Sequence, residues 1–375
     1  MLPHVTDGIV DRRNPAGARQ SATDLDAAAG NRRQWVITAL FLGLAAGQLV
    51  FGPLSDSWGR RRAILAGIAV FTAGSLISAT AQTFEVMLAG RVIQGFGAAG
   101  PRTVTIAMIR DRYEGEAMAR MMSLIMSIFI LVPILAPFLG QMVLLIGNWR
   151  VLFLGVMAFG WFAAFLLVIT VAERKITRPP LQIARILAEA ATVLRHRRAM
   201  AVTLAGACMY GALMGYVNSS QQIFQGMFDT GTLYTVYFGA SAVFIAAGTL
   251  LNRRLLNRFG MQAICVTALA LQTLWAAVFL VLEWGSGGLG LVAFMLFNCP
   301  TLLALGMTFG NFSAMALQSF GAIAGVAAAV QATVMTFGGL VVAALIGNLY
   351  DQTLVPVIGG YLAFGLLAIG LLRLR

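Results

Sequence analysis

Apolar runs of about twenty residues recur along this chain from Gln34 to Leu372. At 1.5 Å per residue, a helix of that length crosses the roughly 30 Å of hydrocarbon in a bilayer. The 375 residues are 59% apolar and only 11% charged, with a mean hydropathy of +0.84. A soluble protein of this length needs more charge to cover its surface. A membrane β-barrel would show strands of alternating polarity, which are missing here. We therefore predict an all-α polytopic membrane protein.

Eleven spans are predicted, five before a long central loop and six after it. They lie near 34–55, 63–82, 84–109, 118–146, 149–172, 199–222, 231–251, 261–282, 289–315, 322–346 and 354–373. Residues 1–33 are polar, so we expect a poorly ordered segment there. The predicted division is an N-terminal helical bundle over 34–172, a cytoplasmic linker over 173–198 and a C-terminal bundle over 199–375.

The distribution of charge predicts the orientation of the spans. A formal charge of +12 would suggest nucleic-acid binding in a soluble chain. Here the basic residues gather in alternate connections, which include Arg60–Arg62 and the tail Arg373 and Arg375. The positive-inside rule places these connections and the C-terminus in the cytoplasm, so no nucleic-acid partner is expected. Eleven spans then put the N-terminus outside, which conflicts with Arg32 and Arg33 before the first span.

The central loop contains a short amphipathic stretch. Its apolar residues share one helical face, and they are Ile183, Ile186, Leu187, Ala190 and Leu194. Its charged residues lie on another face, and they are Arg185, Glu189 and Arg195. This pattern predicts a helix that lies in the cytoplasmic interface.

The stretch GQLVFGPLSDSWGRRR, from Gly47 to Arg62, ends an apolar span in a charge cluster. We expect a helix break at Gly52–Pro53, a carboxylate at Asp56 and a turn at Gly59. A helix that leaves the bilayer on its cytoplasmic side is expected to end in arginines, because these pair with the lipid surface there.

The part of this stretch that begins at Gly52, GPLSDSWGRRR, has a weaker echo that begins at Gly248, GTLLNRRLLNRFG, so we pair Gly248 with Gly52. We assign Gly248, Leu250, Asn252, Arg258 and Gly260 to comparable roles. Both stretches follow one apolar span and precede another, so the two halves are interpreted as repeats. Parallel repeats about an axis along the membrane normal are a transporter architecture. The second half has one span more, so a helix is expected to be missing before Gln34.

Arg91 is the most informative single residue, because it lies well inside the apolar span 84–109. An arginine at that depth costs roughly 2.5–3.5 kcal/mol on insertion scales, so it should face a cavity and have a partner. Gln94 is on the same face, and Arg102 is three helical turns further on and about 20° out of phase. The alternative is that Arg91 extends to the outer membrane surface.

Uncharged amides and prolines mark further candidate positions. Asn218 and Gln222 lie at the end of the span 199–222, and Asn298 lies in the aromatic-rich span 289–315. All three are assigned to a site for a large amphipathic ligand. Hydrogen bonding between helices is the alternative for each. Pro133 and Pro137, with Gly140 beside them, predict a kink in the span 118–146.

Residues for enzymatic chemistry are scarce. His4 and His196 are the two histidines, and the three cysteines lie in apolar runs. No catalytic or metal site can be assembled from them, and no phosphate-binding G-x-x-x-x-G-K-[ST] loop occurs. We therefore predict neither an enzyme nor a cofactor. No Asp or Glu lies deep within a span, although proton-driven antiport usually needs a carboxylate there.

Three motifs resemble those of the major facilitator superfamily. Gly52, Leu54, Asp56, Gly59, Arg60 and Arg61 match its signature loop G-x-L-x-D-x-x-G-R-[KR], although Ser57 stands where a basic residue is usual. The R-x-x-Q-G segment at Arg91 and the PILAPFLG segment are similar to two more of its motifs. The chain most resembles the twelve-helix drug:proton antiporters of the Bcr/CflA-like group.

This resemblance implies a fold of two pseudo-symmetric bundles that works by alternating access in a bacterial inner membrane, as a monomer driven by a proton gradient. It implies that Gly52, Asp56, Gly59, Arg60 and Arg61 form a conformational latch that holds the halves together on the cytoplasmic side. It also implies coupling of proton and substrate by Arg91. The relatives carry a proton-binding acid in the first helix, which we expect this chain to lack.

Three functions remain open at this point. The chain is interpreted as a proton-coupled exporter of lipophilic drugs, with a small molecule and the bilayer as its partners. The alternatives are a facilitator or importer of a specific metabolite, and a truncated product that does not transport.

Overall fold

Residues 34–112, 139–140, 142–143, 149–170 and 182–373 are described by the computed structural model, and within these ranges every element is a helix. The long helices are α2 (Gln34–Trp58), α3 (Arg60–Thr80), α4 (Phe84–Arg112), α6 (Trp149–Thr170), α8 (Arg197–Gln221), α9 (Tyr234–Phe259), α10 (Met261–Ser286), α11 (Leu291–Leu317), α12 (Ala324–Asn348) and α13 (Val355–Arg373). The short helix α7 spans Ile183–Arg195, and the π-helical turn η2 (Gln222–Met227) extends α8.

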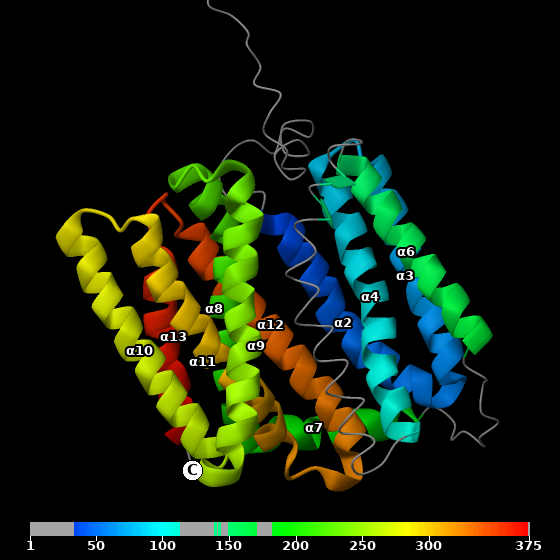
Figure 1. Ribbon diagram of the computed structural model, residues 1–375. Helices are drawn as coiled ribbons and strands as arrows, with labels where there is room; N and C mark the ends of the chain where they lie inside the picture. Colours follow the sequence, from blue (N-terminus) through cyan, green and yellow to red (C-terminus); the bar gives the residue numbers. More distant parts are fainter. Residues whose placement is uncertain (1–33, 113–138, 141, 144–148, 171–181, 374–375) are drawn as a thin grey trace, which may run out of the picture.

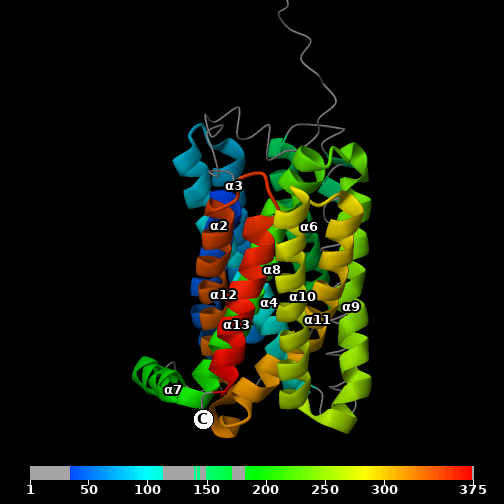
Figure 2. The same cartoon turned by 90° about the vertical axis from the view of Figure 1, so that its left-hand side faces the viewer.

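The long helices run side by side, and α7 lies across their lower end (Figures 1 and 2). Nine of the described helical segments are long and apolar enough to cross a bilayer. The helix α4 runs beside them but carries more charge, including Arg91 and Arg102. The prediction of a polytopic all-α membrane protein is therefore confirmed. The expected span at 118–146 lies almost entirely outside the described residues.

The two arginine-containing turns that follow the repeated stretches, α2–α3 and α9–α10, lie at the same end of the bundle. In Figure 1 the α2–α3 turn, the end of α4, the α9–α10 turn and the C-terminus are all at the lower end, beside α7. The helix α2 begins at the opposite end. The two halves thus have the parallel arrangement that the sequence repeat predicts.

The expected break at Gly52–Pro53 is wrong, because α2 continues through Pro53 to Trp58. In a bilayer each unpaired backbone group costs several kcal/mol, so a helix is kept even where proline removes one bond. Ser55 Oγ also donates a hydrogen bond to Gly52 O, at 2.7 Å. The turn predicted at Gly59 is present, with φ 103°, a conformation that glycine adopts without strain. Gly260, with φ 75°, makes the equivalent turn between α9 and α10.

The turn glycines correct the register of the repeat. Gly248 lies twelve residues before Gly260, and Gly47 lies twelve residues before Gly59. A Cβ at Gly47 would overlap Phe96 O on α4, and one at Gly248 would overlap Leu303 O on α11. Gly248 therefore corresponds to Gly47, a close helix crossing, and the predicted pairing with Gly52 is wrong. A Cβ at Gly52 would meet only ordinary contacts.

The linker helix α7 forms as the sequence predicts, but its apolar residues do not share one environment. Val193 is buried and Ala190 packs beside it, in a cluster with Ala327 and Val330 of α12. Ile183, Leu187 and Leu194 are exposed on the outer side instead. The helix therefore joins the end of the bundle through one edge and leaves a second apolar edge uncovered.

Candidate functional site

A cavity of about 670 Å³ opens at the lower end of the molecule, between the first half, α7 and α12. This volume lies in the range of sites that enclose a drug-sized ligand. Its lining comes from α2 (Gln48, Gly52, Pro53, Asp56), α4 (Arg102, Thr103, Ile106, Asp111), α7 (Arg185, Ile186, Glu189) and α12 (Gly325, Val326, Ala328, Ala329, Ala332), with Ser57, Arg60, Ala107, Gln182 and Ile323.

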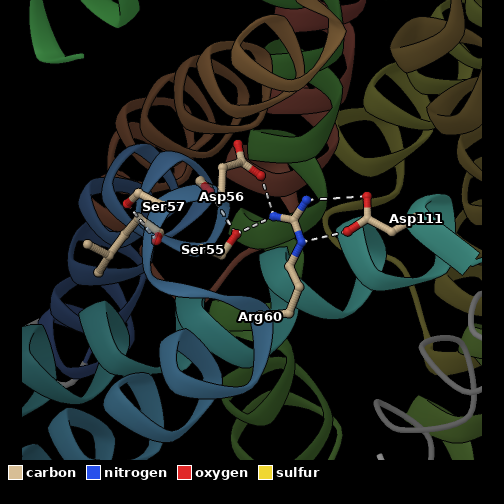
Figure 3. A network of polar contacts seen from close by, with 7 residues as sticks. Ser55, Asp56, Ser57, Arg60 and Asp111 are labelled. Carbon is tan, nitrogen blue, oxygen red and sulfur yellow. Dashed lines mark hydrogen bonds and ion pairs between the residues drawn. The ribbon is translucent and has the colours of Figure 1, made fainter. Parts of the chain in front are cut away.

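The mouth of the cavity carries a charged network centred on Arg60 (Figure 3). Arg60 Nε donates to Asp111 Oδ2 at 2.8 Å, and Nη2 donates to Asp111 Oδ1 at 3.3 Å. Arg60 also pairs with Asp56 and donates to Ser55 Oγ. The turn after α2 is thereby fixed to the last turn of α4. Within the described residues these bonds all stay inside the first half, although the latch is predicted to hold the two halves together.

Contact between the halves is made by packing beside this network. The helices α2 and α12 lie against each other. Thr333 Oγ1 on α12 donates to Ala45 O at 3.1 Å. A Cβ at Gly52 would lie 3.8 Å from both the Cβ of Ala329 on α12 and the Cγ2 of Thr103 on α4, so Gly52 lies where the two halves meet. The positions of Gly52 and Asp56 fit a latch between halves, but the role itself stays a prediction.

The helix α7 closes one side of the mouth. Arg185 Nε donates to Glu189 Oε1 at 2.9 Å, and both residues line the cavity. The linker that joins the two halves along the chain therefore also forms part of the wall between them.

A second polar layer lies deeper in the cavity, at Gln48 and Arg102. Gln48 precedes Asp56 by eight residues, and Arg102 precedes Asp111 by nine, so each lies about 12–14 Å further in along its helix. Gln48 is 3% exposed, and its Oε1 is buried with no hydrogen-bond partner among the described residues. Arg102 is exposed to the cavity and forms no ion pair with a described carboxylate.

Sequence reasoning selected Arg102 and missed Gln48. The available signal was an amide inside an apolar span, one helical turn before Gly52. Arg102 was placed on the same face as Arg91, but the two side chains have different surroundings.

Arg91 lies inside the first half and does not line this cavity. Its Nη1 donates to Gln94 Oε1 at 3.1 Å, and Gln94 Nε2 donates in turn to Ser75 Oγ on α3 at 2.9 Å. The guanidinium carbon lies 4.5 Å from the centre of the Phe153 ring on α6, a cation–π geometry. The expected partner at Gln94 is present, while the coupling role of Arg91 stays a prediction.

The amide residues assigned to a ligand site lie in the second half, away from this cavity. Asn298 is fully buried, and its Nδ2 donates to Ser241 Oγ on α9 at 3.0 Å. That bond between helices fits the alternative interpretation of Asn298. Asn218 Oδ1 and Gln222 Oε1 are buried without partners among the described residues, so their role in a ligand site stays a prediction.

Two remaining expectations can be placed only in part. Pro133 and Pro137 lie outside the described residues, while Gly140 is helical and has open space at its Cβ position. No group of three or more His, Cys, Asp or Glu side chains within the described ranges is arranged to hold a metal ion.

Comparison with known proteins adds a family match. The family model described as Major Facilitator Superfamily matches residues 27–343. The chain is 28% identical to an uncharacterized MFS-type transporter, YdgK, of Bacillus subtilis, over 92% of this chain and 88% of that protein. It is 26% identical to a bicyclomycin resistance protein homolog of Haemophilus influenzae, over 90% of this chain and 85% of that protein. It is 29% identical to the multidrug resistance protein MdtL of Klebsiella pneumoniae, over 81% and 77% respectively.

Among solved structures, the fold is similar to that of a D-xylose-proton symporter. The TM-score is 0.74 at 14% identity, and the match covers 96% of this chain and 92% of the symporter. At this identity the likeness concerns the arrangement of the helices alone.

Proposed function

Because the chain belongs to the major facilitator superfamily, it is a multi-pass membrane transporter rather than an enzyme, and we propose that it exports lipophilic drugs or toxic compounds in exchange for protons. The observation that carries this proposal is the similarity, over about four-fifths of the chain or more, to a bicyclomycin resistance protein homolog and a multidrug resistance protein.

The cavity between the two halves supports transport by alternating access. Its lining comes from α2, α4, α7 and α12, and α2 and α12 belong to different halves. A rocking motion of one half against the other would separate α2 from α12 and change access to this space. Apolar walls from Ile106 and from the small residues of α12 suit a lipophilic substrate.

Coupling to protons requires a group that can bind one. Among the described residues that line the cavity, the carboxylates are Asp56, Asp111 and Glu189. Asp56 and Asp111 share the single cation Arg60, so protonation of either one leaves the other still paired. These two carboxylates are the candidates that the cavity offers for a proton-dependent step.

The proposal includes an orientation and a location. We assign the lower end in Figure 1, with its basic turns and the C-terminus, to the cytoplasm of a bacterium, and the bundle to the inner membrane. The protein then works as a monomer in the bilayer, without a cofactor, and takes its energy from the proton gradient.

Efflux from loaded cells tests the proposal. Cells that express the protein and are preloaded with a lipophilic fluorescent dye should lose dye faster than cells with an empty vector, and a protonophore should abolish the difference. The variant Arg62→Gln removes an exposed arginine that does not line the cavity, and it should leave efflux unchanged. Efflux that persists after collapse of the gradient would exclude proton coupling. Uptake of a labelled metabolite without dye efflux would favour the importer.

A further inference from the structure

We propose that the deep layer of the cavity selects amphiphilic substrates with an anionic group, which Arg102 binds while Gln48 accepts a hydrogen bond from the same molecule. This inference rests on the proposed transport function, because it names the chemical class of ligand for the same cavity. Neither the family match nor the similar proteins assign a ligand to these two residues.

The two residues lie in one layer of the cavity. Gly47 packs against Ala99, and Gly52 lies beside Thr103, so α2 and α4 advance together along their contact. Gln48 follows Gly47 directly, and Arg102 precedes Thr103 directly. Both residues also line the same cavity. One small molecule can therefore meet both side chains.

Arg102 is the cation of this cavity that has no anionic partner among the described residues. Arg60 is shared by Asp56 and Asp111, and Arg185 is paired with Glu189. A guanidinium on the wall of a largely apolar cavity binds carboxylate, sulfonate or phosphate through charge-assisted hydrogen bonds. Among the described side chains that line the cavity, Arg60 at the mouth is thus shared by two carboxylates, while Arg102 in the deep layer is a cation without a carboxylate beside it.

Gln48 supplies the second contact. Its side chain is 3% exposed, it lines the cavity, and Oε1 has no hydrogen-bond partner among the described residues. Leaving a buried acceptor unsatisfied destabilises the empty cavity, so a ligand that donates an N–H or O–H to this oxygen gains affinity. The expected ligand is thus an amphiphile with one anionic group, one hydrogen-bond donor and an apolar body.

The opposite wall fits the apolar body. It consists of Val326, Ala328, Ala329 and Ala332 on α12, and Ile106, one turn after Arg102 on α4, adds an apolar side chain beside the guanidinium. These side chains are small or branched and carry no polar atoms, so they leave room for a flat ring system without specific contacts. The charge of the ligand would then decide which amphiphiles bind, and ligands whose apolar bodies differ in shape would bind with similar affinity.

Two dyes with a shared body provide the probe. Anilinonaphthalene sulfonate and N-phenylnaphthylamine both carry an aromatic amine N–H on a naphthalene, and only the first carries a sulfonate. Their binding to the full-length protein in liposomes is measured by fluorescence titration without any ion gradient, with protein-free liposomes as the blank. The wild-type protein should bind the sulfonate more tightly than the neutral dye.

Variants assign this preference to the two residues. Arg102→Gln should weaken binding of the sulfonate about ten-fold or more, as loss of a charge-assisted hydrogen bond requires, and leave the neutral dye within about two-fold. Arg102→Lys should restore most of the preference. Gln48→Leu should weaken both dyes to a similar extent, because both donate an N–H. Arg62→Gln, which removes an equal charge outside the cavity, should change neither.

Three outcomes would overturn the inference. These are a wild-type protein that binds the neutral dye as tightly as the sulfonate, an Arg102→Gln variant that loses both dyes equally while its thermal unfolding is unchanged, and an equal effect of Arg62→Gln. The wild-type comparison holds even if Arg102→Gln does not fold. Because no gradient is applied, a failure here is separate from a failure of proton-driven efflux.

Discussion

In both halves two helices cross at close glycine contacts, but the polar side chains that join the helices near the crossing differ. In the first half α2 meets α4 at close glycines, and the turn beyond them is held by Arg60, Asp56 and Asp111. In the second half α9 meets α11 at close glycines, but the polar contact is a reciprocal amide pair. Asn311 Nδ2 donates to Asn252 Oδ1 at 2.9 Å, and Asn252 Nδ2 donates back at 3.2 Å.

The corrected register shows where the charges are replaced. Counting from the turn glycines, the counterpart of Arg60 in the second half is Met261, the first residue of α10. Met261 and Gln318 line one small pocket at that end, where the first half has its ion pairs. Among the described residues, the ion pair that joins two helices at this end therefore lies in the first half, which forms the cavity mouth, while α9 and α11 of the second half are joined by neutral amides.

The largest loss of stability is expected at the close glycine contacts that both halves share. A Cβ at Gly95 would overlap Leu40 O, and one at Gly306 would overlap Ile245 O. Gly95→Ala and Gly306→Ala should each destabilise the protein by about 3 kcal/mol or more, because backbone must move apart. Thermal unfolding of the purified protein measures this. Gly310→Ala, on the same helix as Gly306 and with open space at its Cβ, should be harmless. If only one of the two substitutions lowers the unfolding temperature, the two halves do not share the same close helix crossing.

A smaller effect is expected at the amide pair. Asn311 is 3% exposed, so Asn311→Leu leaves Asn252 without its partner in a largely apolar setting. The free energy of unfolding should fall by roughly 1–3 kcal/mol. Because no ion is involved, the loss should be the same in low and high salt. A loss that salt removes would mean that the second half also depends on charge.

The smallest effect on stability is expected at Arg60. The side chains of Asp56 and Asp111 are about half exposed, so Arg60→Gln should cost only about 1 kcal/mol at low ionic strength. The cost should shrink in 1 M salt, where the screening length is about 3 Å. Unfolding at two salt concentrations, with Arg62→Gln as the matched control, measures this. A cost that is independent of salt would contradict an electrostatic role.

Much of the fold could be predicted from the sequence, because span length and loop charge report directly on the bilayer. The register of the repeat could not, since Gly248 resembles Gly52 in local sequence and only the crossing with α11 aligns it with Gly47. The residues that surround Arg91 and Arg102 also could not be predicted from the spacing of polar residues along the helix. Arg91 and Arg102 are eleven residues, about 16 Å, apart along α4, so a shared helical face does not give them the same neighbours.

Some residues of the candidate site could be predicted from the sequence and others could not. Asp56 and Arg60 were found because charge at the end of a span stands out in the sequence. Gln48 was missed because an amide in an apolar span is more often a contact between helices. Its unpaired Oε1 becomes visible only once the surrounding side chains are placed.

The central claim is that a cavity between the two halves opens to the cytoplasm and changes its access during transport. Ala332 on α12 lines that cavity and can be replaced by cysteine in a Cys299→Ala background. A membrane-impermeant maleimide should label Ala332→Cys in inside-out vesicles, and a transported dye should slow the labelling. Leu366→Cys, on an exposed apolar face of α13, should stay unlabelled. Labelling from the outside alone, or at a rate that no dye changes, would contradict the account.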